Sequence, residues 1–137
     1  DAWNATGPIE KLADLDRHSF VKCSIAPDGR ILYCFRRSPS FASPEQQQIY
    51  IRKILGIIAF RRDFLDRLVK LPPARTERVE SIEQLRIIEN GYSMYSVPFS
   101  ESLPSVNEPE EAQIIIEYIK KNSEQKRLLE VTTGVKI

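Results

Sequence analysis

The chain has 137 residues, of which 20 are basic and 19 acidic, so its net charge is +1, and 42% of its residues are hydrophobic. The balanced charge argues against nucleic acid or a membrane surface as partner, and no apolar run approaches the roughly twenty residues that span a bilayer. One histidine and two cysteines argue against a zinc site and a disulfide scaffold. The length fits one domain or part of a larger one, and because Asp1 stands where a Met would open the chain, we interpret it as a fragment or processed piece.

Residues 1–19 are rich in turn-forming residues, with a break at Gly7-Pro8. Alternating residues at 21–25 and 31–35 flank Pro27-Asp28-Gly29, which predicts a β-hairpin. A two-residue turn would place Cys23 directly opposite Cys34, and a three-residue turn would break that pairing. In either case we expect two thiols in a reducing cytoplasm.

Two adjacent guanidinium groups, Arg36 and Arg37, follow the second strand of this hairpin. Such a pair is typical of a site that binds an anionic ligand, and equally of a solvated basic loop. Residues 41–48 are polar and predict a loop. Residues 49–60 form the most apolar run, which predicts a buried central strand.

Apolar residues at helical spacing predict a helix over residues 61–71, ended by two prolines, and a second helix over residues 80–90, ended by Asn90-Gly91. Ser81 and Gln84 have the spacing of a capping box for the second helix, and Val79 flanks its expected apolar stripe.

Glu80, Glu83, Gln84 and Arg86 gather polar groups within about two turns of that second helix. Carboxylate and amide groups bind sugar hydroxyls, and an arginine binds a carboxylate. The alternative is a solvated face with local ion pairs. We predict that Glu83 and Gln84 face a cleft.

A strand is predicted over residues 93–97, and the last helix has the clearest start signals in the chain. Asn107 is a good N-cap, Pro109 suits the first turn, and Ile115, Tyr118 and Ile119 form the stripe to be buried. The remaining residues, 122–137, are a charged extension. Strands that alternate with helices predict an α/β layer structure. The sequence has no glycine-rich phosphate loop and no dinucleotide fingerprint.

Several different short motifs follow one another in a defined order along residues 20–120. They are F-V-K and P-D-G-R-I-L-Y in the hairpin, then L-G-I, F-R-R-D-F-L, L-P-P, E-S-I-E-Q-L-R and E-N-G-Y, and finally V-N-E-P-E-E at residues 106–111. This series resembles the CMP-Kdo synthetases, cytidylyltransferases that activate the acidic sugar Kdo. The E-x-x-E-Q-L-R motif followed by N-G-Y is the most specific part of the resemblance.

The resemblance implies a Rossmann-like nucleotidyltransferase fold with three layers, of which this chain is the C-terminal half with its β-hairpin. Residues 1–122 would form the sugar-binding and dimerisation half, and residues 123–137 a charged tail. The expected substrate-binding residues are Arg36, Glu80, Glu83 and Gln84, and the family position for magnesium is Asn107. CTP, an acidic sugar, a homodimer, the cytoplasm and lipopolysaccharide biosynthesis are implied by the same resemblance.

Three positions depart from the family pattern. Asn107 stands where the family has the magnesium-binding aspartate, and a neutral amide is a weaker ligand for a hard cation. Ile54 and Ile58 replace a histidine and a tyrosine on the sugar side, so the sugar need not be Kdo itself. The leading interpretation is therefore half of a CMP-sugar synthetase without its CTP-binding half, whose catalytic residues stay unknown. A non-catalytic binding or assembly domain, or a structural fragment, are the alternatives.

Overall fold

The computed structural model describes residues 1–102, 105–106 and 108–136 of the chain. The chain divides into two compact units, Asp1–Ser102 and Leu103–Ile137. Within the described residues, none of the helices has the length and apolar character needed to cross a membrane.

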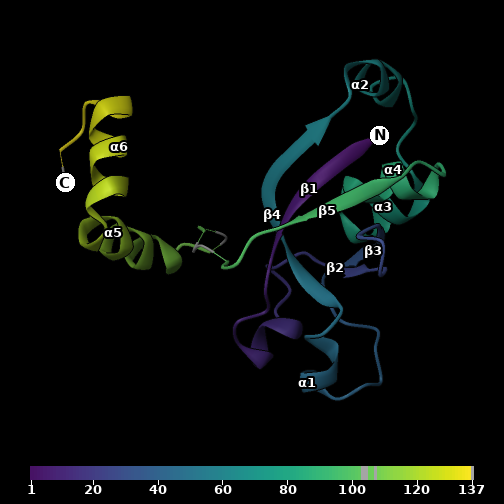
Figure 1. Cartoon of the computed structure of the whole chain (residues 1–137), viewed down its shortest axis with the longest axis horizontal. Coiled ribbons are helices and arrows are strands. Elements are labelled where there is room, and N and C mark those ends of the chain that lie inside the picture. Colours follow the sequence, from purple (N-terminus) through teal and green to yellow (C-terminus); the bar gives the residue numbers. More distant parts are fainter. Residues whose placement is uncertain (103–104, 107, 137) are drawn as a thin grey trace. The chain divides into compact units, whose positions relative to one another are not determined.

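The first unit is built on one mixed sheet of five strands in the order β3-β2-β4-β1-β5 (Figure 1). The strands are β1 (Ala2–Gly7), β2 (Lys22–Ile25), β3 (Ile31–Phe35), β4 (Ile51–Phe60) and β5 (Met94–Pro98). Strand β4 pairs with β2 on one side and with β1 on the other, which confirms the predicted central position. The expectation that this strand is buried is wrong for residues 54–60, none of which is buried and among which Ile57 is 65% exposed.

The prediction of turns for residues 1–19 is wrong at its start, because residues 2–7 form β1. This strand lies between β4, to which it is antiparallel, and β5, to which it is parallel. Its small and polar residues have weak β-propensity, and the two neighbouring strands supply the ladder hydrogen bonds that propensity does not predict.

The hairpin of β2 and β3 is present, and Cys23 lies opposite Cys34. Its loop is the three-residue one, since the Ala26 N–H donates to the Arg30 carbonyl across residues 27–29. A register shift between Ser24 and Ile25 restores the pairing, because β3 carries one extra residue there. The expectation that a three-residue turn separates the cysteines is therefore wrong. Both are free buried thiols, and burial raises the pKa of Cys23 to about 12.

Short helices complete the first unit: η1 (Leu12–Leu15), α1 (Pro44–Gln47), α2 (Arg62–Leu68), α3 (Arg75–Glu80) and α4 (Gln84–Glu89). Helix α1 falls within the predicted loop 41–48, where Ser43 and Gln46 form a capping box. Helix α2 matches the helix predicted after the central strand, although it ends at Leu68.

The single helix predicted over residues 80–90 is instead two helices, α3 and α4, which lie side by side (Figure 1). Ser81 ends α3 in the left-handed conformation, with φ of 54°, and does not cap α4. The turn at Ser81 brings Ile82 into the core and leaves Val79 77% exposed, so Val79 is not part of the buried stripe. The predicted stop at Asn90-Gly91 is confirmed, with Gly91 at φ 78°.

Arg36 holds this junction between α3 and α4. Its guanidinium donates to the carbonyl oxygens of Glu80 (3.1 Å) and Ser81 (3.1 Å), and to that of His18 (3.0 Å). A left-handed Ser strains the backbone, and it persists where its surroundings hold it in place. The three hydrogen bonds from Arg36 supply that support.

The main core lies between the sheet and the helices α2 and α4, with Ile82 from the turn between α3 and α4. Its buried members are listed here together: Ala2, Cys23, Ile31, Cys34, Phe64, Ile82, Leu85, Ile87 and Met94. A smaller cluster of Ile9, Leu15, Phe35 and Ile51 lies on the other face, because neighbouring strand residues point to opposite faces. The sheet therefore has helices and η1 on different faces, as an α/β layer structure requires.

Lys22 is fully buried in β2, and its Nζ donates to the carbonyls of Asp14 (3.1 Å) and Arg17 (2.7 Å). These two bonds attach the segment around η1 to the sheet. Burial lowers the pKa of Lys22 to about 8, against the opposing effect of Asp16 and Asp14.

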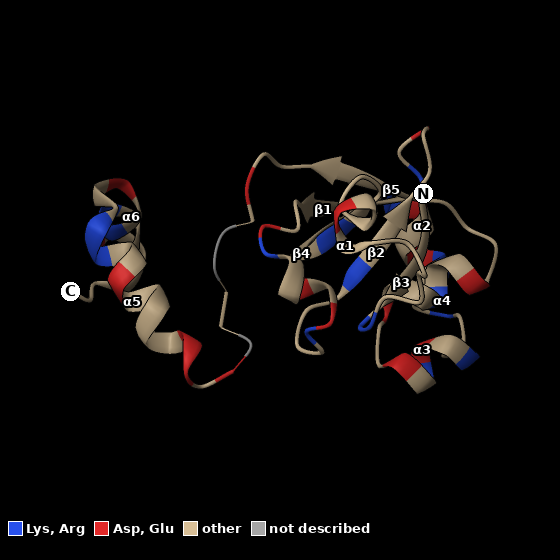
Figure 2. Ribbon diagram, turned by 90° about the horizontal axis from the view of Figure 1, so that it is seen from below, with Lys and Arg blue, Asp and Glu red and all other residues tan. Residues whose placement is uncertain are grey.

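The second unit contains α5 (Glu111–Lys121) and α6 (Ser123–Thr133). Helix α5 begins after Glu110, later than predicted, and Asn107 lies outside the described residues. Residues 123–133, part of the charged extension for which the sequence predicted no element, are helical. The Asn122 side chain caps α6 by accepting from the Gln125 N–H (3.1 Å). Acidic and basic side chains are interspersed along α3 and α6 (Figure 2).

Replacing Arg36 by Gln should lower the free energy of unfolding by about 1–2 kcal/mol, because charge-assisted bonds to three carbonyls are lost at a partly exposed site. Urea denaturation measures the loss. Arg37→Gln is the matched control, since Arg37 is exposed and adjacent. Equal effects of the two substitutions would show that Arg36 does not support the junction.

The buried Lys22 predicts a pH dependence of stability. Its folded pKa, about 8, lies below the unfolded value of about 10.4. Between these values the unfolded chain binds the extra proton, so the contribution of Lys22 to stability rises with pH. The unfolding free energy of the wild type minus that of Lys22→Met should therefore increase from pH 8 to pH 10. A difference that stays constant, or decreases, over this range would contradict the assignment.

Candidate functional site

A cavity of about 230 Å³ opens between the end of β4, helix α2 and helix α4. Five of the side chains that line it are apolar and three are polar. The lining residues are Ile58, Phe60, Leu68, Val69, Glu83, Gln84, Arg86 and Ile87. Concave sites with an apolar wall and a few polar groups are typical of small-molecule binding.

Glu83 and Gln84 lie next to each other on the wall of this cavity, which places both at a concave surface as predicted. Gln84 is 6% exposed, and its Nε2 donates to Oδ1 of Asn4 (3.2 Å). Asn4 is fully buried in β1, and its Nδ2 donates to the carbonyl of Leu55 (2.9 Å). The Gln84 side chain is thus anchored to β1, and it does not cap α4.

Asn4 lies at a register shift between β1 and β4. It pairs with Ile58, whereas Thr6 pairs with Ile54, so β4 carries extra residues around Gly56. The bulge exposes the Leu55 carbonyl to the Asn4 amide. A fold with an unbroken ladder here would leave Gln84 without its anchor.

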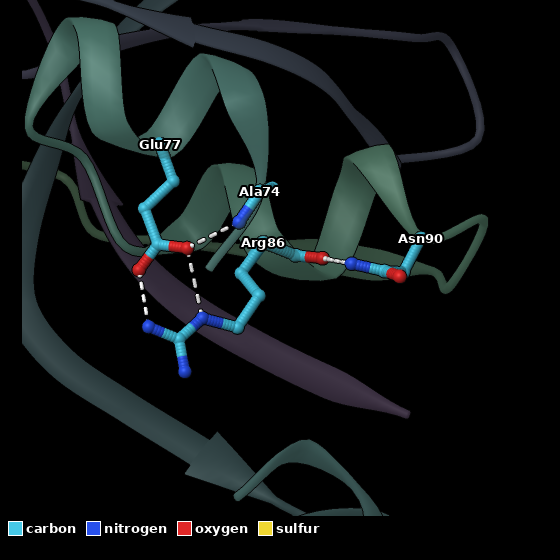
Figure 3. A network of polar contacts seen from close by, with 4 residues as sticks. All are labelled: Ala74, Glu77, Arg86 and Asn90. Atoms are coloured by element: carbon cyan, nitrogen blue, oxygen red, sulfur yellow. Dashed lines mark hydrogen bonds and ion pairs between the residues drawn. The ribbon is translucent and has the colours of Figure 1, made fainter. Parts of the chain in front are cut away.

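Arg86 points into an ion pair and is not free to bind an anion (Figure 3). Its Nε donates to Glu77 (2.8 Å), and its Nη2 donates to the other oxygen of the same carboxylate. The Glu77 carboxylate also accepts the N–H of Ala74 (2.9 Å) at the start of α3. The hydrogen bond from Arg86 lowers the pKa of Glu77 and raises that of Arg86.

Glu83 is exposed at the N-terminal end of α4. Among the described residues, its carboxylate makes no hydrogen bond or ion pair. A carboxylate on a cavity wall without an internal partner is available to a ligand.

The structure separates the other two expected substrate-binding residues from the cavity wall. Glu80 is the last residue of α3, and it meets Arg36 through its backbone carbonyl. Nε and both terminal nitrogens of Arg36 donate hydrogen bonds to backbone carbonyls. Its guanidinium therefore stabilises the backbone and is not an open anion-binding site. Neither residue is among those that line the cavity.

The two hydrophobic replacements have different positions. Ile58 lines the cavity, whereas Ile54 packs against the main core. Of these two side chains, the one at the cavity surface is Ile58.

The described ranges contain no group of three or more His, Cys, Asp or Glu side chains that could hold a metal ion. Asn107, the position that the sequence resemblance gives for magnesium, lies outside them. Hard cations require several oxygen ligands, usually with carboxylates among them. The described side chains therefore do not by themselves fit a magnesium ion.

Sequence reasoning missed Asn4, which orients Gln84. The signal was present in the alternation of Ala2, Asn4 and Thr6, which is the pattern of a strand with one polar face. It was hidden because Ala, Asn and Gly are also common in turns.

Known proteins similar to this chain were found by sequence. They are named 3-deoxy-manno-octulosonate cytidylyltransferase and come from Synechococcus elongatus (36% identical over 101 residues, covering 74% of this chain and 41% of the relative), Chlorobium limicola (32% over 118 residues, 83% and 46%) and Chlorobaculum tepidum (39% over 104 residues, 72% and 40%). No protein-family model matches the chain.

A similar solved structure is CMP:2-keto-3-deoxy-manno-octonic acid synthetase complexed with CTP. It matches with a TM-score of 0.76 and 26% identity, over 88% of this chain and 49% of the other. The five-stranded sheet and its helices thus belong to the Rossmann-like nucleotidyltransferase fold. The chain spans less than half the length of the curated relatives it matches. By sequence and by fold, this chain belongs to the 3-deoxy-manno-octulosonate cytidylyltransferase family, the CMP-Kdo synthetases.

Proposed function

We propose that this chain supplies the sugar-binding half of a CMP-sugar synthetase. Such an enzyme transfers a cytidylyl group from CTP to an acidic sugar. The observation that carries the proposal is that Glu83 and Gln84, the residues of the E-x-x-E-Q-L-R motif, lie together on the wall of one cavity. The family relationship supplies the class of substrate.

In the reaction implied, a sugar hydroxyl attacks the α-phosphate of CTP and pyrophosphate leaves. The residues of this chain would bind and orient the sugar. Glu83 accepts hydrogen bonds from sugar hydroxyls, and the anchor of Gln84 on Asn4 holds its amide in one orientation. The apolar wall excludes water from one side of the sugar. Magnesium would supply charge neutralisation at the phosphates, and since the described residues do not fit it, we assign no step of this chain to the metal.

A non-catalytic binding or assembly domain is the second candidate. It is favoured by one observation, that the apolar side chain of Ile58 lines the cavity. The resemblance implies a polar group at this position in the family. Both candidates retain sugar binding, so a binding experiment tests what they share.

The proposal also assigns this chain a role in dimerisation, through the loop of residues 36–51 and the hairpin. Large apolar side chains are exposed to solvent along this segment. Phe41 is fully exposed, Ile49 is 84% exposed, and Leu32 of the hairpin is 46% exposed. Exposed apolar residues gathered on neighbouring segments are typical of protein interfaces.

A substitution that fills the cavity tests sugar binding. Val69→Trp should weaken binding of Kdo by about tenfold or more, because the larger side chain occupies space on the cavity wall. Isothermal titration calorimetry on the 137-residue chain measures it. Val79→Trp is the control, because Val79 is 77% exposed against 70% for Val69 and is not among the residues that line the cavity. Equal affinity in both variants would place the sugar elsewhere.

Dimerisation is tested by sedimentation equilibrium. The double substitution Phe41→Ser and Ile49→Ser should convert the dimer to monomer, because it removes the exposed apolar surface of the loop. Val131→Ser, on exposed α6, should leave the dimer intact. A wild-type chain that stays monomeric at high concentration would disprove this role.

A further inference from the structure

We propose that Cys23 and Cys34 are a redox-active thiol pair, which closes to a disulfide between β2 and β3 when the chain meets a peroxide. In the structure both residues are free thiols. Strand β3 is an outermost strand of the sheet, so the bond locks it to β2. The sugar-binding role uses neither thiol, and the disulfide therefore forms whether or not that role is correct.

The register of the hairpin determines how the two cysteines face each other. Cys23 lies directly opposite Cys34. On the other side of β2, the carbonyl of Val21 accepts the N–H of Ile54 in β4 (2.9 Å). Alternate residues of a strand turn their backbone groups to the same neighbour, so the backbone groups of Cys23 also point to β4. Cys23 and Cys34 are therefore a cross-strand pair that exchanges no backbone hydrogen bonds.

The separation of such a pair suits a disulfide. Directly opposite residues without mutual backbone hydrogen bonds have Cα atoms about 4.5 Å apart, and disulfides join Cα atoms that are roughly 4.4–6.8 Å apart. Side chains of directly opposite residues point to the same face of the sheet. Cys23 and Cys34 belong to the same core cluster, and both are 0% exposed. The two strands thus hold the thiols at a separation that a bond can span with the backbone in place.

The reaction with hydrogen peroxide has two steps. One thiolate sulfur attacks a peroxide oxygen, the O–O bond breaks, and a sulfenic acid forms while the leaving hydroxide takes up a proton to become water. The sulfur of the second cysteine then attacks the sulfenic sulfur, so that the S–S bond forms, the S–O bond breaks and a second water leaves. Together the two thiols lose two electrons and two protons, and the peroxide is reduced to two waters.

Burial controls the rate of this reaction. It raises the pKa of Cys23 to about 12 and raises the pKa of Cys34 well above its ordinary value. Because the thiolate is the reactive form, the closed hairpin reacts slowly. Strand β3 pairs along its length with β2 alone, and elements held on one side open locally at a lower free-energy cost than the whole fold. Local opening of β3 therefore sets the rate of oxidation.

The disulfide also changes the stability of the fold beneath α4. Leu85 and Ile87 of α4 belong to the same core cluster as the two cysteines, so β3 supports the packing of this helix. A bond between residues 23 and 34 closes a loop in the unfolded chain and lowers its entropy. We expect the unfolding equilibrium constant of the oxidised chain to be about a hundredfold lower than that of the reduced chain.

The test treats the 137-residue chain with hydrogen peroxide at pH 7. Intact mass should fall by about 2 Da, peptide mapping should find Cys23 linked to Cys34, and dithiothreitol should restore the original mass. The chain has two cysteines, so a bond between chains is recognised by its doubled mass. Oxidation should be faster in urea at concentrations below the unfolding transition, because local opening exposes the thiols. Urea denaturation of the oxidised and the reduced chain then measures the change in stability.

The matched controls are Cys23→Ala and Cys34→Ala, which each retain one thiol. Peroxide should add oxygen to these variants, and their stability should not increase. Each oxidised variant is compared with its own reduced form, so any loss of stability from the substitution cancels. The proposal is overturned if the treated wild type, with or without urea, keeps two thiols, gains oxygen, or forms bonds between chains. A disulfide that lowers the stability of the wild type would overturn it as well, because the native register would then not suit the bond.

Discussion

The bracing between α3 and α4 is the constraint on which the site depends. Each helix has six residues, and helices this short are unstable in water because nucleation is costly. Here each helix stabilises the other. Glu89, at the end of α4, accepts the Arg75 and Thr76 N–H groups at the start of α3 (3.0 and 2.8 Å). Glu77 of α3 pairs with Arg86 of α4 (Figure 3). The carboxylates of Glu77 and Glu89 both lie at the positive end of the α3 dipole and accept N–H groups that this helix cannot pair internally.

This bracing explains why polar residues of one motif have such different roles. Arg86 and Glu77 stabilise the helix pair, and Gln84 connects α4 to β1 through Asn4. The carboxylates of Glu80 and Glu83 make no hydrogen bond or ion pair with described residues, and of these two Glu83 is the one that lines the cavity. A surface ion pair contributes little by itself, but the Glu77–Arg86 pair is bidentate and shares its carboxylate with a helix N-terminus. Three residues of the motif, Glu83, Gln84 and Arg86, line the cavity, and Glu83 is the one whose side chain makes no hydrogen bond or ion pair within the described part of the chain.

Arg36 illustrates the difference between a residue near a site and a residue in it. Its position after the hairpin suits the binding of an anion, but Nε, Nη1 and Nη2 all donate hydrogen bonds to backbone carbonyls. The planar fork of arginine matches such a set of oxygens better than a lysine would. By holding the left-handed Ser81, it sets the direction in which α4 leaves α3. Its effect on the cavity is exerted through α4.

The sequence by itself determined the elements that carry strong local signals: the hairpin, the central strand, α2, β5 and the stop at Gly91. It also determined the resemblance to the CMP-Kdo synthetases. Period and turn chemistry specify these locally. The tertiary structure alone decided the rest. Strand β1 forms because β4 and β5 pair with it, and α3 separates from α4 because Ser81 is held in a left-handed conformation by Arg36, 45 residues away in sequence. The cavity, too, depends on contacts between distant segments, since Asn4 and Gln84 are 80 residues apart. Local pattern cannot encode such contacts, because their energy comes from groups that only the folded chain brings together.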